Sequence, residues 1–163
     1  MSGFCHVQTR SAALTVKTSV NDDTLRRFLG YRLKRAYSSL RADLLARLEP
    51  LGLRITTYSA LVLIVDNPGL RQSELASALD IKRSNIVAIL DDLEARGWVV
   101  RQRDPLDRRV FTLSATASGL KVCRRALAMD TKHESRLLAC LSSRETERLS
   151  ALLEKIELSA EEQ

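Results

Sequence analysis

The sequence predicts a mainly α-helical fold with one small β-hairpin. Leucine and alanine account for 28 and 17 of the 163 residues, whereas aromatic residues make up only 4%, and this composition favours helix over sheet. Leucines recur every three or four positions over most of the chain, which is the spacing of an amphipathic helix. β-Branched and aromatic residues gather in two short runs, at 98–103 and 110–113, around a loop that contains proline and aspartate.

The first elements can be placed in order along the chain. Residues 1–21 show no periodicity, and we interpret them as an N-terminal arm. A long amphipathic helix is expected from Asp22, and Pro50 ends it. A second helix begins near Thr57, and the turn sequence Asn-Pro-Gly at 67–69 stops it.

Two short helices come next, at about 72–79 and 82–96. Only Asp80 and Ile81 separate them, and so short a linker is typical of a sharp helix–turn–helix. Gly97 is well placed to end the second helix, because glycine adopts the left-handed conformation at low cost. The hairpin follows directly, so the segment is expected to be a winged helix–turn–helix, and two further helices complete the chain.

We divide the chain into three parts on this basis. They are the arm at 1–21, a helical region formed by 22–54 together with 115–163, and a winged lobe at 55–114. The leucine stripes of the terminal helices are too long for the lobe to cover, and an amphipathic helix must bury its stripe to be stable. Packing against the same helices of a second copy meets this need. The sequence therefore predicts a twofold homodimer, with the N- and C-terminal helices as its dimerisation region.

The second helix of the pair has an outer face that suits DNA. Opposite its apolar side it presents short side chains, of which Ser and Asn can hydrogen-bond base edges and Val and Ala can contact thymine methyl groups. The cationic residues and free amides at its start suit phosphate. The residues expected to contact DNA here are Lys82, Arg83, Ser84, Asn85, Val87 and Ala88. An ordinary solvent-exposed helix face would have a similar composition, so this helix alone does not decide the function.

The hairpin carries the second candidate feature, a cluster of arginines around two aspartates. The cluster consists of Arg101, Arg103, Asp104, Asp107, Arg108 and Arg109. Arginine suits a narrow minor groove, whose negative potential attracts it, and Asp107 is close enough in sequence to hold the guanidinium of Arg109. A solvated charged turn is the alternative. An exposed Arg–Asp pair stabilises a fold by at most about 1 kcal/mol, however, so folding alone gives little reason for the cluster.

These residues resemble the MarR (multiple antibiotic resistance regulator) family over about residues 25–157. The matching motifs are Leu75-Ala76, Leu93-Glu94-Ala95-Arg96-Gly97, Asp104-Pro105-Leu106-Asp107-Arg108-Arg109 and Thr116-x-x-Gly119. The resemblance implies a homodimeric winged helix–turn–helix protein, usually a repressor of neighbouring genes. It also implies that the helix at 82–96 enters the major groove, while Arg109, held by Asp107, enters the minor groove. Twofold symmetry then predicts a near-palindromic operator.

The sequence departs from the family pattern at two positions. Arg71 stands where a Ser or Thr usually caps the first helix of the pair, and Ala115 replaces the leucine that usually precedes Thr116. We expect Arg71 to add a phosphate contact at some loss of helix stability, because it lacks the short oxygen side chain of a good cap.

The resemblance also implies that the protein senses a small molecule. Family members often bind phenolic or aromatic carboxylate ligands between the dimer helices and the winged lobe, and Arg32 and Tyr58 lie on the segments that would line such a cleft. An arginine can pair with a carboxylate, and a tyrosine can stack or hydrogen-bond. A surface arginine and a core tyrosine are the ordinary alternatives for these two positions.

Two other modes of action stay open. Another branch of the family senses peroxide through a cysteine near the start of the first helix, whereas Cys5 lies in the arm well before that helix. A cysteine-based redox-responsive regulator is therefore one alternative. A helical dimer that acts through protein contacts, with a winged lobe that no longer binds DNA specifically, is the other.

No catalytic site, metal site or cofactor is expected. His6 and His133 are isolated, no glycine-rich phosphate loop occurs, and Cys5, Cys123 and Cys140 are too far apart for a zinc site or a disulfide scaffold. The expected partners are double-stranded DNA, a second copy and a small-molecule effector. No apolar run approaches the ~20 residues of a membrane span, and the N-terminus has no signal-peptide pattern. We therefore expect a cytoplasmic protein that has no membrane partner.

Overall fold

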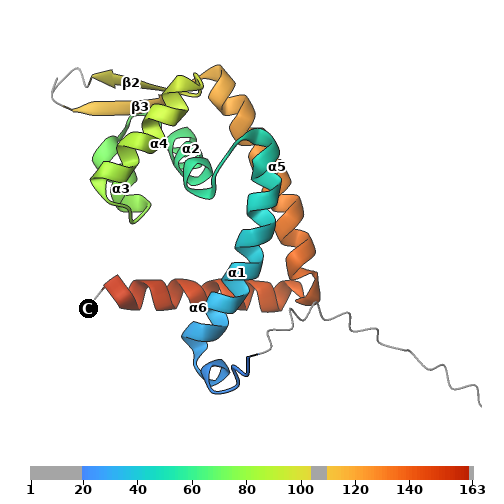
Figure 1. The fold of residues 1–163 in the computed structure, drawn as a ribbon. Helices are drawn as coiled ribbons and strands as arrows, with labels where there is room; N and C mark the ends of the chain where they lie inside the picture. Colours follow the sequence, from blue (N-terminus) through green and yellow to red (C-terminus); the bar gives the residue numbers. More distant parts are fainter. Residues whose placement is uncertain (1–19, 104–109, 162–163) are drawn as a thin grey trace, which may run out of the picture. The chain divides into compact units, whose positions relative to one another are not determined.

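The computed structural model describes residues 20–103 and 110–161, which are mainly helical with a small antiparallel sheet (Figure 1). The fold class predicted from the sequence is confirmed. The α-helices are α1 (Leu29–Leu48), α2 (Ile55–Asp66), α3 (Gln72–Ala78), α4 (Arg83–Ala95), α5 (Ala117–Leu137) and α6 (Ser143–Glu161). Short 3-10 turns occupy Leu25–Arg27, Glu49–Leu51 and Leu138–Cys140, and the strands are β1 (Leu70–Arg71), β2 (Val99–Arg103) and β3 (Phe111–Ala115).

The chain separates into two compact units, with the boundary inside α1 after Arg35. In the described part of the first unit, Asp22 accepts hydrogen bonds from Arg26 Nε and from the Tyr31 hydroxyl, both at 2.7 Å. These two donors, Arg26 first, lower the pKa of the Asp22 carboxyl. The first long helix was expected to begin at Asp22, but Phe28 is extended (φ −92°, ψ 129°) and α1 begins after it.

The core of the winged lobe lies between α2, α3, α4 and the sheet. Its fully buried members are Ala60, Leu61, Ile64, Leu75, Ile86, Leu90, Leu93 and Leu113, with Val99 and Cys123 at 1% exposure. Residues 86, 90 and 93 follow the helical repeat, so the apolar side of α4 is the predicted one. At the end of α4, Gly97 takes the left-handed conformation (φ 68°), which confirms the predicted helix stop.

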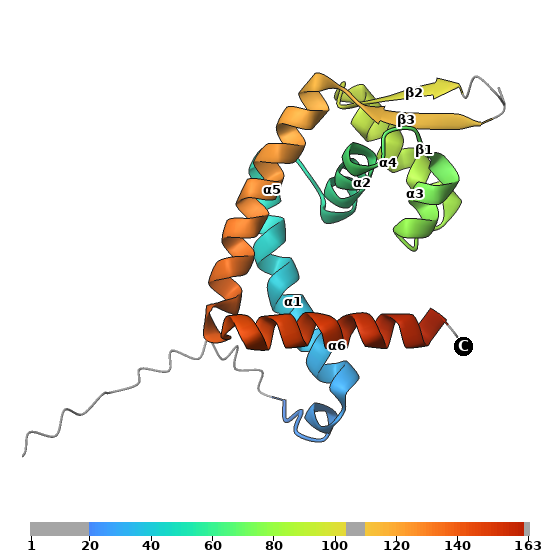
Figure 2. The same ribbon diagram turned by 180° about the vertical axis from the view of Figure 1, so that it is seen from behind.

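The sheet has the strand order β1-β3-β2, and all its pairs are antiparallel. Leu70 lies opposite Leu113, and Arg103 lies opposite Phe111. The sequence pattern predicted only the β2–β3 hairpin. It missed β1 because two residues carry no periodicity, whereas pairing with β3 defines the strand (Figure 2).

The start of α5 is fixed to the base of the hairpin. The Thr116 hydroxyl accepts a hydrogen bond from the Gly119 N–H (3.0 Å) and donates one to the Gly97 carbonyl (2.7 Å). A Cβ at position 119 would lie 2.0 Å from the Trp98 carbonyl oxygen, so only glycine fits this close approach. The Thr116-x-x-Gly119 motif therefore has a packing role.

The two last helices differ in how much they bury. Helix α5 packs on α2 through Cys123 and Ala126, whose side chains are buried. Helix α6 instead exposes apolar side chains: Leu149 is 39% exposed, Leu152 50%, Leu153 41% and Ile156 46%. No single described helix is both long and apolar enough to cross a membrane, although the consecutive segments Leu29–Leu51 and Ile55–Asp66 pass that test when taken together.

Candidate nucleic-acid interface

The open face of α4 consists of short side chains, as the sequence predicted. Ser84, Asn85, Val87 and Ala88 are exposed, and Lys82 precedes the helix as its N-cap residue without a capping side chain. The first turn contains no acidic residue, so its positive end is not neutralised by its own helix. The side chain of Arg83 lies outside the described part. The exposed residues at the centre of this face are small or of medium size and uncharged.

Arg101 lies at the base of the hairpin and is engaged by α4. Its side chain is 18% exposed; its guanidinium pairs with Asp91 through Nη2 and lies 2.8 Å from Glu94 Oε2 through Nε. Its backbone N–H also donates to Glu94 Oε1 at 3.0 Å. The two carboxylates therefore fix β2 against α4. From the sequence, Arg101 is predicted only as a DNA contact; this clamp was not predicted, although acids three residues apart on α4 were a usable signal.

The wing itself is only partly described. Arg103 ends β2, and its guanidinium lies over the ring of Phe111 with 5.0 Å to the ring centroid. The predicted minor-groove residues Asp107, Arg108 and Arg109 lie outside the described residues. β2 ends at Arg103, whose side chain is exposed, and β3 begins at Phe111.

Arg71 is the N-cap residue of α3 and is exposed. Its backbone N–H donates to Glu74 Oε2 at 2.8 Å, which is the half of a capping box that comes from the third helical residue. Glu74 therefore offsets part of the stability that the missing Ser or Thr cap would supply. The Arg71 backbone also pairs with Thr112 of β3, so the sheet fixes where this side chain begins.

Tyr58 and Arg32, the two residues predicted to contact an effector, belong to different compact units of the chain. Tyr58 is buried, and its hydroxyl donates to Asp130 Oδ2 of α5 at 2.8 Å. Burial first, and then this hydrogen bond, raise the pKa of Tyr58 far above its usual range. Arg32 belongs to the first unit, where its Nε donates to the Arg26 carbonyl at 2.6 Å. Tyr58 is therefore a tie between α2 and α5 as well as a candidate ligand contact.

A cavity of about 270 Å³ lies between the second half of α1, the start of α2 and α5. Its lining residues are Tyr37, Leu40, Arg41, Leu44, Ile55, Asp130, His133 and Glu134. His133 is 3% exposed, and its Nδ1 lies 2.5 Å from Asp43 Oδ2, which also accepts from Arg47 Nε at 3.1 Å. Arg47 and then the histidine lower the pKa of Asp43. His133 looks isolated in the sequence because its partner Asp43 is 90 positions away, and only the packing of the helices brings the two residues together.

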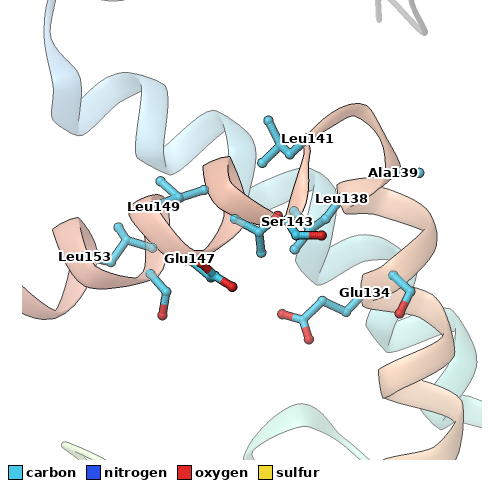
Figure 3. Close-up of a pocket in the computed structure, with 11 residues that line it drawn as sticks. Glu134, Leu138, Ala139, Leu141, Ser143, Glu147, Leu149 and Leu153 are labelled. Atoms are coloured by element: carbon cyan, nitrogen blue, oxygen red, sulfur yellow. The ribbon is translucent and has the colours of Figure 1, made fainter.

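The junction of α5 and α6 forms a wider apolar cavity of about 610 Å³. Leu138, Leu141, Leu149 and Leu153 line it, and Figure 3 shows the carboxylates of Glu134 and Glu147 at its open side. The leucines of α6 stay open to solvent here, so a single chain does not bury them. Among the described residues no group of three or more His, Cys, Asp or Glu side chains could hold a metal ion.

Residues 51–110 of the chain match the family model described as MarR family. The HTH-type transcriptional repressor Rv2887 of Mycobacterium tuberculosis is 31% identical over 128 residues, which are 78% of this chain and 92% of that protein. This chain belongs to the MarR family. The resemblance stated from the wing and helix motifs is confirmed, and the MarR-family chain is a transcriptional regulator by membership.

Solved structures agree with this assignment. The repressor CouR bound to a 23-mer DNA duplex is 38% identical to this MarR-family chain, with a TM-score of 0.80 over 86% of this chain and 99% of that one. CouR bound to p-coumaroyl-CoA gives 37% identity and a TM-score of 0.76 over 85% and 97%. A regulatory protein named for the hcr operon of Thauera aromatica is 37% identical over 99 residues, so the match spans 60% of that protein's length.

Proposed function

We propose that this MarR-family regulator is a homodimeric repressor that binds a near-palindromic operator and is released by a small aromatic ligand. The observation that carries the proposal is the open, short-chained face of α4, with one flank fixed to the wing base by Arg101. A recognition helix must hold its orientation to read base edges, and this clamp supplies that rigidity. The similarity to CouR, solved on DNA, supports the same role.

The DNA contacts divide by chemistry. Ser84, Asn85, Val87 and Ala88 face the base edges, whereas Lys82, Arg83 and Arg71 bind phosphate. Arg103, Arg108 and Arg109, with Asp107 holding Arg109, serve the minor groove. Arg101 is assigned to positioning the wing, because two carboxylates already engage its guanidinium.

The dimer is proposed to form through the helical region, residues 22–54 with 115–163, while residues 55–114 make the DNA-binding lobe. The exposed leucine stripe of α6 supports this division, because it lacks a cover in one chain. Two lobes related by a twofold axis read half-sites about one helical turn apart. Such a regulator acts in the cytoplasm, where bacterial DNA is.

The effector is proposed to be an aromatic acid or its thioester. The cavity offers an apolar wall, the hydroxyl of Tyr37 and the cationic Arg41, and it also contains the carboxylates of Asp130 and Glu134. Asp130 already accepts a hydrogen bond from Tyr58. Arg32 is the further cation that we predict for a ligand carboxylate. The ligand must bind the DNA-free conformation more tightly than the DNA-bound one to release the operator. The similarity to CouR, solved with p-coumaroyl-CoA, supports this chemical class.

The direct test is a mobility-shift titration with the DNA upstream of the regulator's own gene. We expect saturable, sequence-preferring binding that weakens as salt rises. Arg109→Ala should cost about 1–3 kcal/mol of binding free energy and leave the dimer intact. Binding with no preference over random DNA would overturn the proposal, and unchanged affinity of Arg109→Ala would remove that residue from the interface.

A further inference from the structure

The recognition helix α4 has two flanks, and the wing covers only one of them. Asp91 and Glu94 face the wing base, where they engage Arg101. At 100° per residue, Asp92 and Arg96 lie on the opposite flank. That flank borders a cavity of about 260 Å³, which α4 shares with the start of α2. Its lining residues are Gly52, Arg54, Thr56, Thr57, Ala88, Ile89, Asp92 and Arg96.

The start of α2 presents unused hydrogen-bond donors to this cavity. Its N-cap residue Arg54 is extended (φ −91°, ψ 158°) and supplies no capping side chain, and the first turn contains no acid. The Tyr58 N–H is the first to find a carbonyl, that of Arg54, at 2.8 Å. The preceding three amides therefore point out of a helix of 12 residues with no acceptor among the described residues. Such amides and the helix dipole favour an anion.

A buried hydroxyl gives an independent indication of a ligand. Thr57 is 4% exposed and lines the cavity. Within residues 20–103 and 110–161 its hydroxyl has no hydrogen-bond partner, whereas the hydroxyl of the neighbouring buried residue Tyr58 is satisfied by Asp130. Among the described residues the fully buried side-chain atoms without a hydrogen-bond partner are Arg101 Nε and His133 Nδ1, so the Thr57 oxygen is reachable from the cavity that Thr57 lines, where it can donate to a group that enters.

The charges around the cavity favour a negative ligand. Arg96 Nε pairs with Asp92 at 2.9 Å, and its guanidinium lies 5.0 Å from the centroid of the Trp98 ring. The Asp92 charge is thereby compensated. Arg54 is exposed and has no acidic partner in the described part of the chain. Arg54 and the N-terminus of α2 therefore make the electrostatic potential in the cavity positive.

We propose that Arg54, Thr57 and the first amides of α2 bind a phosphate of the DNA backbone, on the side of the recognition helix opposite the wing. This inference rests on the proposed function. The major groove is bordered by two strands, so a helix within it meets phosphates on both flanks. Ala88 belongs both to the predicted base-reading face and to the wall of the cavity, which places the phosphate site at the edge of the DNA-facing surface.

The test compares the salt dependence of operator binding for Arg54→Ala and Thr57→Val, with Arg144→Ala on α6 as the matched charge control. Each lost phosphate contact reduces the slope of log K against log salt by about 0.9, so Arg54→Ala should reduce it by about 1.8 in a dimer. Affinity at fixed salt should fall about tenfold for Arg54→Ala and a few-fold for Thr57→Val. Thermal unfolding should be unchanged, since Val has the shape of Thr and Arg54 is exposed.

The outcomes separate this proposal from the proposed function. Wild-type slope and affinity in both variants would overturn the phosphate site and leave the repressor role intact, whereas absence of specific binding by the wild type would already contradict the role. A second arm titrates inorganic phosphate without DNA and follows the amide resonances of Thr56 and Thr57. Saturation below about 1 mM would assign a free-anion site and overturn the DNA assignment; small, unsaturated shifts support it.

Discussion

The winged lobe and helix α6 differ in how far they bury their leucine side chains. In the lobe, Leu61, Leu75 and Leu90 are completely buried, and Leu63, Leu70 and Leu79 are partly buried against the same core. Helix α6 carries a leucine stripe of similar density, but its members Leu152 and Leu153 stay 50% and 41% exposed. Burying a leucine side chain is worth about 1.5–3 kcal/mol. The lobe therefore stabilises itself, whereas α6 has a sequence suited to a surface that one chain does not provide.

The largest effect, a loss of folding stability, is expected from a substitution in the core of the winged lobe. Leu90→Ala removes a fully buried side chain between α4 and its neighbours, and such truncations cost about 2–5 kcal/mol. Chemical denaturation should show the lower free energy of unfolding, and operator binding should fall with it. A loss below 1 kcal/mol would mean that the lobe core is not the stabilising unit.

The next effect should appear in assembly instead of folding. Leu152→Ala changes both copies of a twofold interface, so we expect about 2–4 kcal/mol weaker dimerisation. Lys155→Ala on the same helix is the matched control and should leave dimerisation unchanged. Sedimentation equilibrium measures both, and near-ultraviolet circular dichroism should show that the Trp98 environment in the lobe is retained. Equal dimer affinity in both variants would remove α6 from the interface.

A smaller effect separates a positioning role from a DNA contact at the wing base. Arg101→Ala should lower operator affinity by about 1 kcal/mol, because β2 loses its clamp on α4. The slope of log K against log salt should stay at its wild-type value, since no phosphate contact is lost. Arg101→Lys should not restore affinity, because one ammonium cannot engage Asp91 and Glu94 in the same fork geometry. A slope reduced by about 0.9 per subunit would instead show direct phosphate contact.

The smallest effect is the pH dependence of the start of α6. Glu145 accepts hydrogen bonds from the Ser142 N–H (2.8 Å) and hydroxyl (2.7 Å), and these lower the pKa of its carboxyl below 4.5. A depressed folded-state pKa gives stability that is present above the unfolded value and is lost as pH falls through the folded value. Helicity of α6 should therefore decline below about pH 4. Glu145→Gln should lack this step in a circular-dichroism titration, and an identical acid profile would contradict the assignment.

Local sequence patterns predicted most of the helices and the hairpin. They did not predict the side-chain contacts between residues that are far apart in the sequence. The buried side of α4 and its stop at Gly97 depend on spacing and on glycine conformation, which are properties of the segment itself. The Tyr58–Asp130 tie joins residues 72 positions apart, and the His133–Asp43 contact spans a longer interval. Both depend on how α5 packs on other helices, which no local period specifies. The Arg101 clamp differs, because it joins β2 to α4 across ten residues or fewer and the two acids of α4 were a usable signal for it.

The central claim is that two winged lobes, joined by helices that one chain leaves uncovered, read one operator. Sedimentation of the protein on the DNA upstream of its own gene, combined with a footprint, tests it most directly. We expect two chains per site, half-sites one helical turn apart, and loss of the complex in Leu152→Ala at concentrations where the wild type binds. One chain per site, or equal occupancy by the wild type and Leu152→Ala, would contradict the claim.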